Sequence, residues 1–185
     1  RYFPGKPLPP DDEAGRRATI AQVSQAVSQE HGQPEDLITD ARATVGRIKE
    51  FIRAKDILRL PEPDRCQIIE MPEFRRGNSL AYLDSALPLD PKGTSSYAVS
   101  PPPSDWSEAR IRSFLEEYNQ HMLQVLTIHE AYPGHYVQLE YSNRCPSLIR
   151  RVLQSGVFIE GWAVYTEQMM LDQGYGDGNL ALRLN

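Results

Sequence analysis

Hydrophobic residues recur at helical spacing in the first third of the chain. After a proline-rich lead-in over residues 1–12, two runs of three- and four-residue steps predict two helices, with Gly32 ending the first and Pro61 ending the second. Pro34 and the two acidic residues after it are typical of a first helical turn. Residues 1–63 are therefore interpreted as a helical scaffold. The apolar positions are Ile20, Val23 and Val27 in the first run and Ala41, Val45, Ile48 and Ile52 in the second.

Short runs rich in β-favouring residues replace the helical period between residues 64 and 104. Residues 66–71 and 95–100 are the clearest runs, and prolines and glycines bound them. Three prolines follow the second run directly, which favours a strand at the edge of a sheet. This segment is predicted to form a small sheet with an open edge, next to an irregular stretch.

A helical pattern returns at Ser107. Apolar residues follow at steps of four and three, and the last step of four reaches His129, which is therefore expected to face inward. Two more helices are predicted over residues 148–155 and 157–172. The face that leads to His129 consists of Ile111, Leu115, Tyr118, Met122 and Val125.

The expected fold class is mainly α (α+β), a helical domain with a small sheet. Residues 1–185 are interpreted as one catalytic domain, in which residues 105–185 supply the helices of the site. The last residues, 179–185, begin an apolar helical pattern with no stop signal, so the chain is expected to be a piece of a longer protein.

Composition and charge limit the classes of binding partner that are expected. The net charge is −5, and no basic run appears, so a nucleic-acid partner is not expected. No apolar stretch is long enough to span a bilayer. The chain opens at Arg1 without a secretory signal, so an exported (periplasmic or lipoprotein) and a cytoplasmic location both stay open. Cys66 and Cys145 lie outside any metal-binding cysteine motif, and two thiols are favoured over a disulfide.

The segment from His129 to His135 carries the candidate chemistry. A His-Glu pair with a second histidine nearby is typical of zinc hydrolases, in which two imidazoles bind the metal and the glutamate acts on water. The usual histidine spacing is four residues, but here it is six. On an unbroken helix, six residues place the second side chain about 120° off and about 9 Å further along. Pro133 and Gly134 can supply the bend that brings His135 back.

Glu160 is the best candidate for the third ligand. Together with Val164, Glu167 and Leu171 it forms one helix face, so that two carboxylates lie in an otherwise apolar stripe. Buried carboxylates are costly unless they are paired, protonated or bound to metal. Glu167, two turns further on, is expected to orient a ligand histidine through its free ring nitrogen.

The predicted mechanism is hydrolysis with Zn²⁺, in which Glu130 is the general base that activates water. The reaction also needs a donor to the oxyanion of the substrate. Tyr132 and Tyr165 are the nearest candidates in the sequence, and neither is favoured.

Two motifs resemble a known family. Residues 129–138 and 160–167 are similar to the paired signatures HExxPGH and EGWAxYxE of the bacterial family called domain of unknown function 885. Residues 70–77 and 96–99 resemble its upstream pattern. The resemblance covers the chain from about residue 66 to its end, and full family members are much longer.

The resemblance implies a gluzincin-like metallopeptidase, largely helical with a small sheet beside the cleft. It implies His129, His135 and Glu160 as metal ligands, Glu130 as the base, and short peptides as the substrate. It also implies that the strand at 97–100 pairs with an extended peptide.

Several side chains keep alternative interpretations. Tyr97 and Arg76 are weaker candidates for substrate contacts, and for Arg76 the interpretation as a solvated arginine is favoured. His31 and His121 are interpreted as surface residues. Two functional alternatives to the peptidase remain, namely a peptide-binding module without metal chemistry and a purely structural helical domain.

Overall fold

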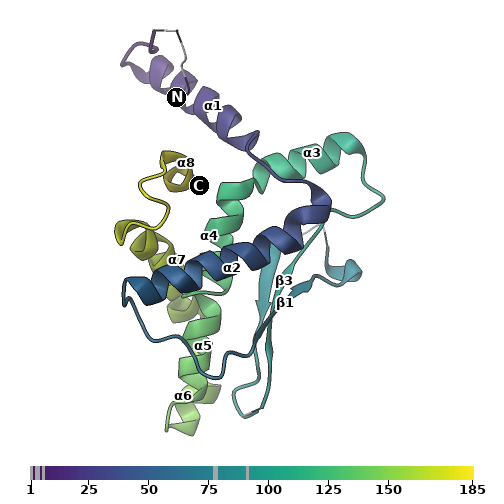
Figure 1. The fold of residues 1–185 in the computed structure, drawn as a ribbon, viewed down its shortest axis with the longest axis vertical. Helices are drawn as coiled ribbons and strands as arrows, with labels where there is room; N and C mark the ends of the chain where they lie inside the picture. The colour runs from purple at the N-terminus through teal and green to yellow at the C-terminus, as the bar shows by residue number, and fades with distance from the viewer. Residues whose placement is uncertain (1, 3–4, 6, 77–78, 91) are drawn as a thin grey trace.

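The computed structural model describes residues 2, 5, 7–76, 79–90 and 92–185, so the lead-in predicted for residues 1–12 is described only in part. The described chain is mainly helical with a small sheet, and the predicted fold class is confirmed. Figure 1 shows a sheet flanked by helices, with α1 projecting away from the other helices. The elements in chain order are α1 (Glu13–Ser28), α2 (Leu37–Ala54), β1 (Cys66–Glu70), β2 (Ala81–Asp84), β3 (Ser95–Val99), α3 (Glu108–Glu117), α4 (Gln120–Glu130), α5 (His135–Asn143), α6 (Leu148–Val152), α7 (Gly156–Asp172) and α8 (Leu180–Leu184).

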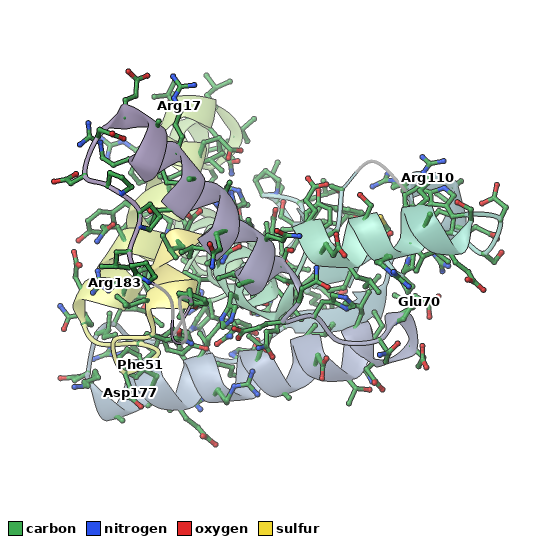
Figure 2. The ribbon with its side chains drawn as sticks, turned by 90° about the horizontal axis from the view of Figure 1, so that it is seen from above. Arg17, Phe51, Glu70, Arg110, Asp177 and Arg183 are labelled. Atoms are coloured by element: carbon green, nitrogen blue, oxygen red, sulfur yellow. The ribbon has the colours of Figure 1, made fainter. Side chains whose placement is uncertain are left out.

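The two helices predicted in the scaffold are confirmed, but they differ in how much they bury. A short 3₁₀ turn at Pro34–Asp36 leads into α2, whose predicted apolar face is entirely buried. In α1, by contrast, Val27 is buried while Ile20 is 65% exposed. Helix α2 therefore anchors the scaffold to the core, and α1 stands out from it. The view from above shows α1 and α3 diverging from each other (Figure 2).

The three strands form a mixed sheet in the order β1-β3-β2. Strand β3 is parallel to β1 and antiparallel to β2, so it lies in the centre. The predicted edge position of the 95–100 run is therefore wrong, because the prolines begin only after Val99 and end the strand without blocking either side. Strand β2, which the sequence did not reveal, is the edge strand that lies against α4.

The helical run predicted from Ser107 to His129 is broken into α3 and α4. Asn119 caps α4, because its side chain accepts hydrogen bonds from the backbone N–H groups of His121 and Met122. The hydrophobic period continues across the break, and for this reason the pattern alone did not reveal it.

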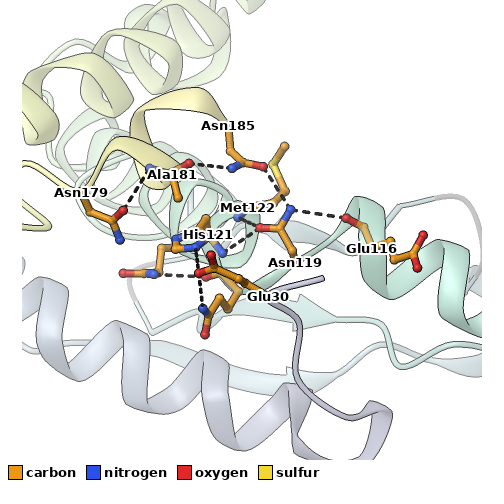
Figure 3. Close-up of polar contacts among 10 residues, drawn as sticks. Glu30, Glu116, Asn119, His121, Met122, Asn179, Ala181 and Asn185 are labelled. Carbon is orange, nitrogen blue, oxygen red and sulfur yellow. Dashed lines mark hydrogen bonds and ion pairs between the residues drawn. The ribbon is translucent and has the colours of Figure 1, made fainter. Parts of the chain in front are cut away.

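His121 is buried, contrary to the prediction of a surface residue. Its Nε2 lies 3.0 Å from the carboxylate of Glu30, which follows α1, and Asn119 Nδ2 donates to Asn185 after α8 (Figure 3). These polar contacts join the ends of α1 and α8 to the beginning of α4, where they hold a histidine that lies outside the candidate site.

The core is formed chiefly by α2, α4, the sheet and the chain after α7. Phe51 at the end of α2 makes an edge-to-face contact with Tyr175, with ring centroids 5.3 Å apart, near the loop that carries Asp177 (Figure 2). Cys66 and Cys145 are free thiols in this structure. Among the described residues, no helix combines the length and the apolar character needed to cross a membrane.

Candidate metal centre

A tight turn between α4 and α5 compensates for the six-residue spacing of the histidines. The backbone N–H of Gly134 donates to the carbonyl of Ile128, six residues earlier, at 3.0 Å. Helix α5 then begins at His135, directly beside the last turn of α4. A Cβ on Gly134 would lie 1.8 Å from the carbonyl oxygen of His129, so this close approach requires glycine. The predicted bend at Pro133 and Gly134 is confirmed.

A partly buried polar network supports this turn. The hydroxyl groups of Tyr132 and Tyr136 both donate to the carboxylate of Asp64, which also pairs with Lys49. Tyr132 is 1% exposed, so it cannot contact substrate, and its candidate role as an oxyanion donor is wrong. On the other side, the indole N–H of Trp162 donates to the carbonyl of Pro133 at 2.9 Å.

The three predicted ligands converge on one point. Their ligand atoms all lie within 4.8 Å of one another, and Glu160 Oε2 is 3.6 Å from the Nε2 atoms of both His129 and His135. Bonds of about 2.0 to 2.1 Å in tetrahedral geometry place two ligand atoms about 3.4 Å apart. The two separations of 3.6 Å are close to this value, and the remaining separation, between the two histidine nitrogens, lies within 4.8 Å. The two imidazole rings are nearly perpendicular, at 87°, with centroids 4.7 Å apart.

Glu167 fixes the orientation of the first histidine. Nδ1 of His129 donates to Glu167 Oε1 at 2.6 Å, so Nε2 keeps its lone pair toward the ligand cluster. This hydrogen bond is the main reason that the pKa of His129 is raised above 6.5, although burial acts in the opposite direction. A proton therefore competes with a metal at His129 more strongly than at an ordinary histidine.

The second histidine has the opposite electrostatic environment. Burial lowers the pKa of His135 below 6.5, and the neighbouring charge of His129 lowers it further. His135 is accordingly neutral near pH 7, which is the form that binds a metal.

Glu130 lies at the end of α4, next to the edge of the sheet. Its Oε2 accepts a hydrogen bond from the backbone N–H of Leu83 in β2 at 3.0 Å. Burial raises the pKa of Glu130 above 4.5, while the charge of His129 and the bond from Leu83 act against this. A half-buried carboxylate with a raised pKa suits a group that must accept a proton.

The proposed ligand Glu160 does not lie in a buried stripe, contrary to the sequence prediction. Its side chain is 67% exposed, and Val164, one turn further along α7, is 57% exposed. This face of α7 is solvent-facing at its N-terminal half, because α4 and α5 cover the helix only from the side of Ala163 and Thr166. The site is therefore open to solvent at Glu160.

The structure places three weaker candidates for substrate contact away from the proposed ligands or in contacts with other parts of the protein. Tyr97 is fully buried, and its hydroxyl bonds the Thr127 hydroxyl at 3.0 Å. Arg76 pairs with Glu70 and also donates to a backbone carbonyl, so it is held by the protein itself. Tyr165 lies five residues after the ligand of α7, so it points about 140° away around the helix axis.

One pocket of the described residues is formed without the proposed metal ligands. It is a cavity of about 550 Å³ between α5, α6 and α7, with an apolar lining that includes Val137, Phe158 and Trp162. None of the three proposed ligands lines it.

Comparisons with known proteins place the sequence in a family. Residues 11–185 match the family described as "Bacterial protein of unknown function (DUF885)". The chain belongs to this family. The family resemblance drawn from the two motifs is thereby confirmed, whereas the description assigns DUF885 no activity. No curated protein matched the sequence.

Two solved structures, both described as a "putative lipoprotein", are similar to this DUF885 chain. The one from Shewanella oneidensis, also described as of unknown function, is 37% identical with a TM-score of 0.80. That match covers 99% of this chain and 31% of the Shewanella protein. The one from Colwellia psychrerythraea is 21% identical with a TM-score of 0.54. This match covers 96% of this chain and 25% of the Colwellia protein, and it shows a shared fold. The chain thus spans about a third of the length of the Shewanella protein.

Sequence reasoning missed two parts of the site. The contact between Leu83 and Glu130 uses a backbone N–H, for which no residue type gives a signal. Asp64 follows two prolines in a segment without periodicity, and only the fold shows that it lies beneath the turn of the motif.

Proposed function

We propose that this chain forms the catalytic centre of a zinc-dependent peptidase. The observation that supports the proposal most is the convergence of two imidazole nitrogens and one carboxylate oxygen within 4.8 Å of one another, with the carboxylate oxygen 3.6 Å from each nitrogen. Three protein ligands leave a fourth position open, as in catalytic zinc sites. The adjacent carboxylate of Glu130 supplies the group that a hydrolytic reaction needs beside that position.

Zinc bound at this site would lower the pKa of a bound water and polarise a substrate carbonyl. Glu130 accepts the proton of the attacking water and then donates it to the leaving amine. Glu167 keeps His129 in the tautomer that leaves Nε2 free, and the turn at Gly134 holds His135 beside it.

The substrate that fits this arrangement is an extended peptide along the edge of β2. This replaces the earlier expectation for β3, which has a partner on each side. Strand β2 is paired only on one side, and Leu83 in it already contacts the proposed base. A peptide added to this edge would lie beside Glu130.

The decisive experiment compares Glu130→Gln with the unchanged protein in digests of a peptide library, using the complete protein to which this chain belongs. Hydrolysis should fall by at least about 100-fold, because the general base is removed, while zinc content and thermal unfolding stay unchanged. Glu117→Gln, which removes the charge of an exposed glutamate on α3, is the matched control and should keep full activity.

Each alternative predicts a different result. A structural domain would bind no stoichiometric zinc, and a peptide-binding module would retain peptides without cleaving them. Either result in the unchanged protein contradicts the peptidase. The description of the Shewanella protein as a lipoprotein also favours export of this chain, which fractionation of the producing cells would test.

A further inference from the structure

The register of β2 shows which of its backbone groups face the open edge. The backbone N–H of Ser100 donates to the carbonyl of Leu80 at 2.6 Å, so these two residues form a hydrogen-bonded pair. Such pairs alternate with non-hydrogen-bonded pairs along an antiparallel ladder. Ala81 and Leu83, opposite Val99 and Tyr97, therefore direct their N–H and C=O groups away from β3. The position of Leu83 N–H, bonded to a side chain outside the sheet, agrees with this register.

The carboxylate of Glu130 lies at a position where a hydrogen-bond donor is needed to stabilise its negative charge. It is the last residue of α4, where the carbonyl groups of the helix terminus repel a negative charge. The N–H of Leu83, at 3.0 Å from Oε2, supplies a partner at that end. Because this donor belongs to a strand of the sheet, it restricts the carboxylate more than a solvent water would.

We propose that the main-chain N–H of Leu83 is the positioning group for the catalytic base. The inference rests on the proposed function and deepens it. Leu83 holds Oε2 of Glu130 at the sheet edge, and the second carboxylate oxygen remains able to accept the proton of water. Ala81 is only 6% exposed, so an extended peptide on this edge bonds the C=O of Leu83, while the N–H of Leu83 stays with Glu130.

The contact itself can be tested without any activity. Amide hydrogen exchange at Leu83 should become about 10-fold faster or more in Glu130→Ala, because the bond that protects this outward-facing amide is lost. The amide of Tyr82, which the register pairs with Ala98 of β3, is the internal control and should not change. An unchanged rate at Leu83 would overturn the inference.

The positioning role can be tested by removing one N–H group. Replacing the residue-83 amide by an ester, with the α-hydroxy analogue of leucine, should lower kcat about 10- to 100-fold, since a hydrogen bond to a carboxylate is worth about that factor. KM and the affinity for zinc should stay within about twofold, because Leu83 touches no metal ligand. The matched control is an ester at Ala81, the other outward-facing amide of β2, and it should leave kcat unchanged.

Two further comparisons separate positioning from a general structural effect. Leu83→Pro removes the same N–H without breaking a ladder bond. It should reproduce the loss of kcat caused by the ester, provided that its unfolding curve matches that of the unchanged protein. In the Glu130→Gln background the ester should cause no additional loss of kcat, because the two changes act on one unit. An additive loss, or a parallel loss of zinc affinity, would overturn the role. If the unchanged protein hydrolyses no peptide, the proposed function and the positioning role both fail. If the hydrogen-exchange rate of the Leu83 amide is unaltered in Glu130→Ala, the positioning role alone fails.

Discussion

Replacing Glu167 by glutamine keeps the shape of the side chain and removes its charge. The substitution therefore isolates the effect of the carboxylate that accepts the Nδ1–H of His129 at 2.6 Å. Glu167 is 28% exposed and touches no other proposed ligand, so the fold should tolerate the change. What the variant should lose is the charge that strengthens His129 as a metal ligand.

The expected loss is 10- to 100-fold in the affinity for zinc at about pH 8, equivalent to about 1.4 to 2.7 kcal/mol. This is the usual effect of removing a carboxylate that supports a ligand histidine. The short distance and the half-buried position of His129 favour the upper part of this range.

The difference between the two proteins should shrink as the pH falls. In the unchanged protein the hydrogen bond from His129 to Glu167 raises the pKa of His129, so a proton begins to compete with zinc above pH 6.5. Glutamine at position 167 removes that charge and lowers the pKa of His129, so the variant meets less competition. At about pH 6 the ratio of the two zinc dissociation constants should accordingly be smaller than at about pH 8.

Competition with a chromophoric zinc chelator measures both dissociation constants at each pH. Asp172→Asn, which removes a charge from the same helix without contacting a ligand, is the control and should bind zinc as the unchanged protein does. Equal affinities for Glu167→Gln and the unchanged protein at about pH 8 would refute this account of the His129–Glu167 pair. A ratio that grows as the pH falls would refute the assigned direction of the pKa shift.

Two further substitutions test the turn. Gly134→Ala should destabilise the protein by about 3 kcal/mol and reduce zinc binding, because its Cβ would clash with the carbonyl of His129, and unaltered urea unfolding would contradict this. Burial raises the pKa of Asp64, but hydrogen bonds from Lys49 and Tyr132 outweigh it, so the pKa lies below 3.8. The stabilising effect of this carboxylate is therefore present above pH 3.8 and lost as the pH falls through the lower, folded-state pKa. Asp64→Asn should be less stable than the unchanged protein at about pH 7, and the difference should shrink as the pH falls below 3.8 when urea unfolding is compared across that range.

Much of the helical architecture could be predicted from the sequence because the relevant signals are local. The period of α2 and its proline boundaries identify a helix from about twenty consecutive residues. The proximity of His129 and His135 was also predictable, since Pro133 and Gly134 lie directly between them. The long-range partner Glu160 was found only because a second acidic motif accompanies the first.

The arrangement of the sheet could not be predicted in this way. Strand order depends on contacts between segments far apart in sequence, and proline after β3 indicated only where that strand ends. Strand β2 has four residues and no clear alternation, so it gave too little signal to be recognised. Likewise, the exposure of Glu160 depends on which neighbours cover α7, and a helical period states only which residues share a face.

The six-residue spacing changes what determines the geometry of the metal site. In a motif with histidines four residues apart, the rise and twist of one helix fix their separation. Here the two histidines belong to different helices, so their separation depends on the junction between α4 and α5. The network of Asp64 and the hydrogen bond of Gly134 hold that junction, although neither residue touches a proposed ligand atom. Zinc affinity should therefore respond to substitutions at Asp64 and Gly134 as well as at the ligands, and this response would show that the junction carries the role of a continuous helix.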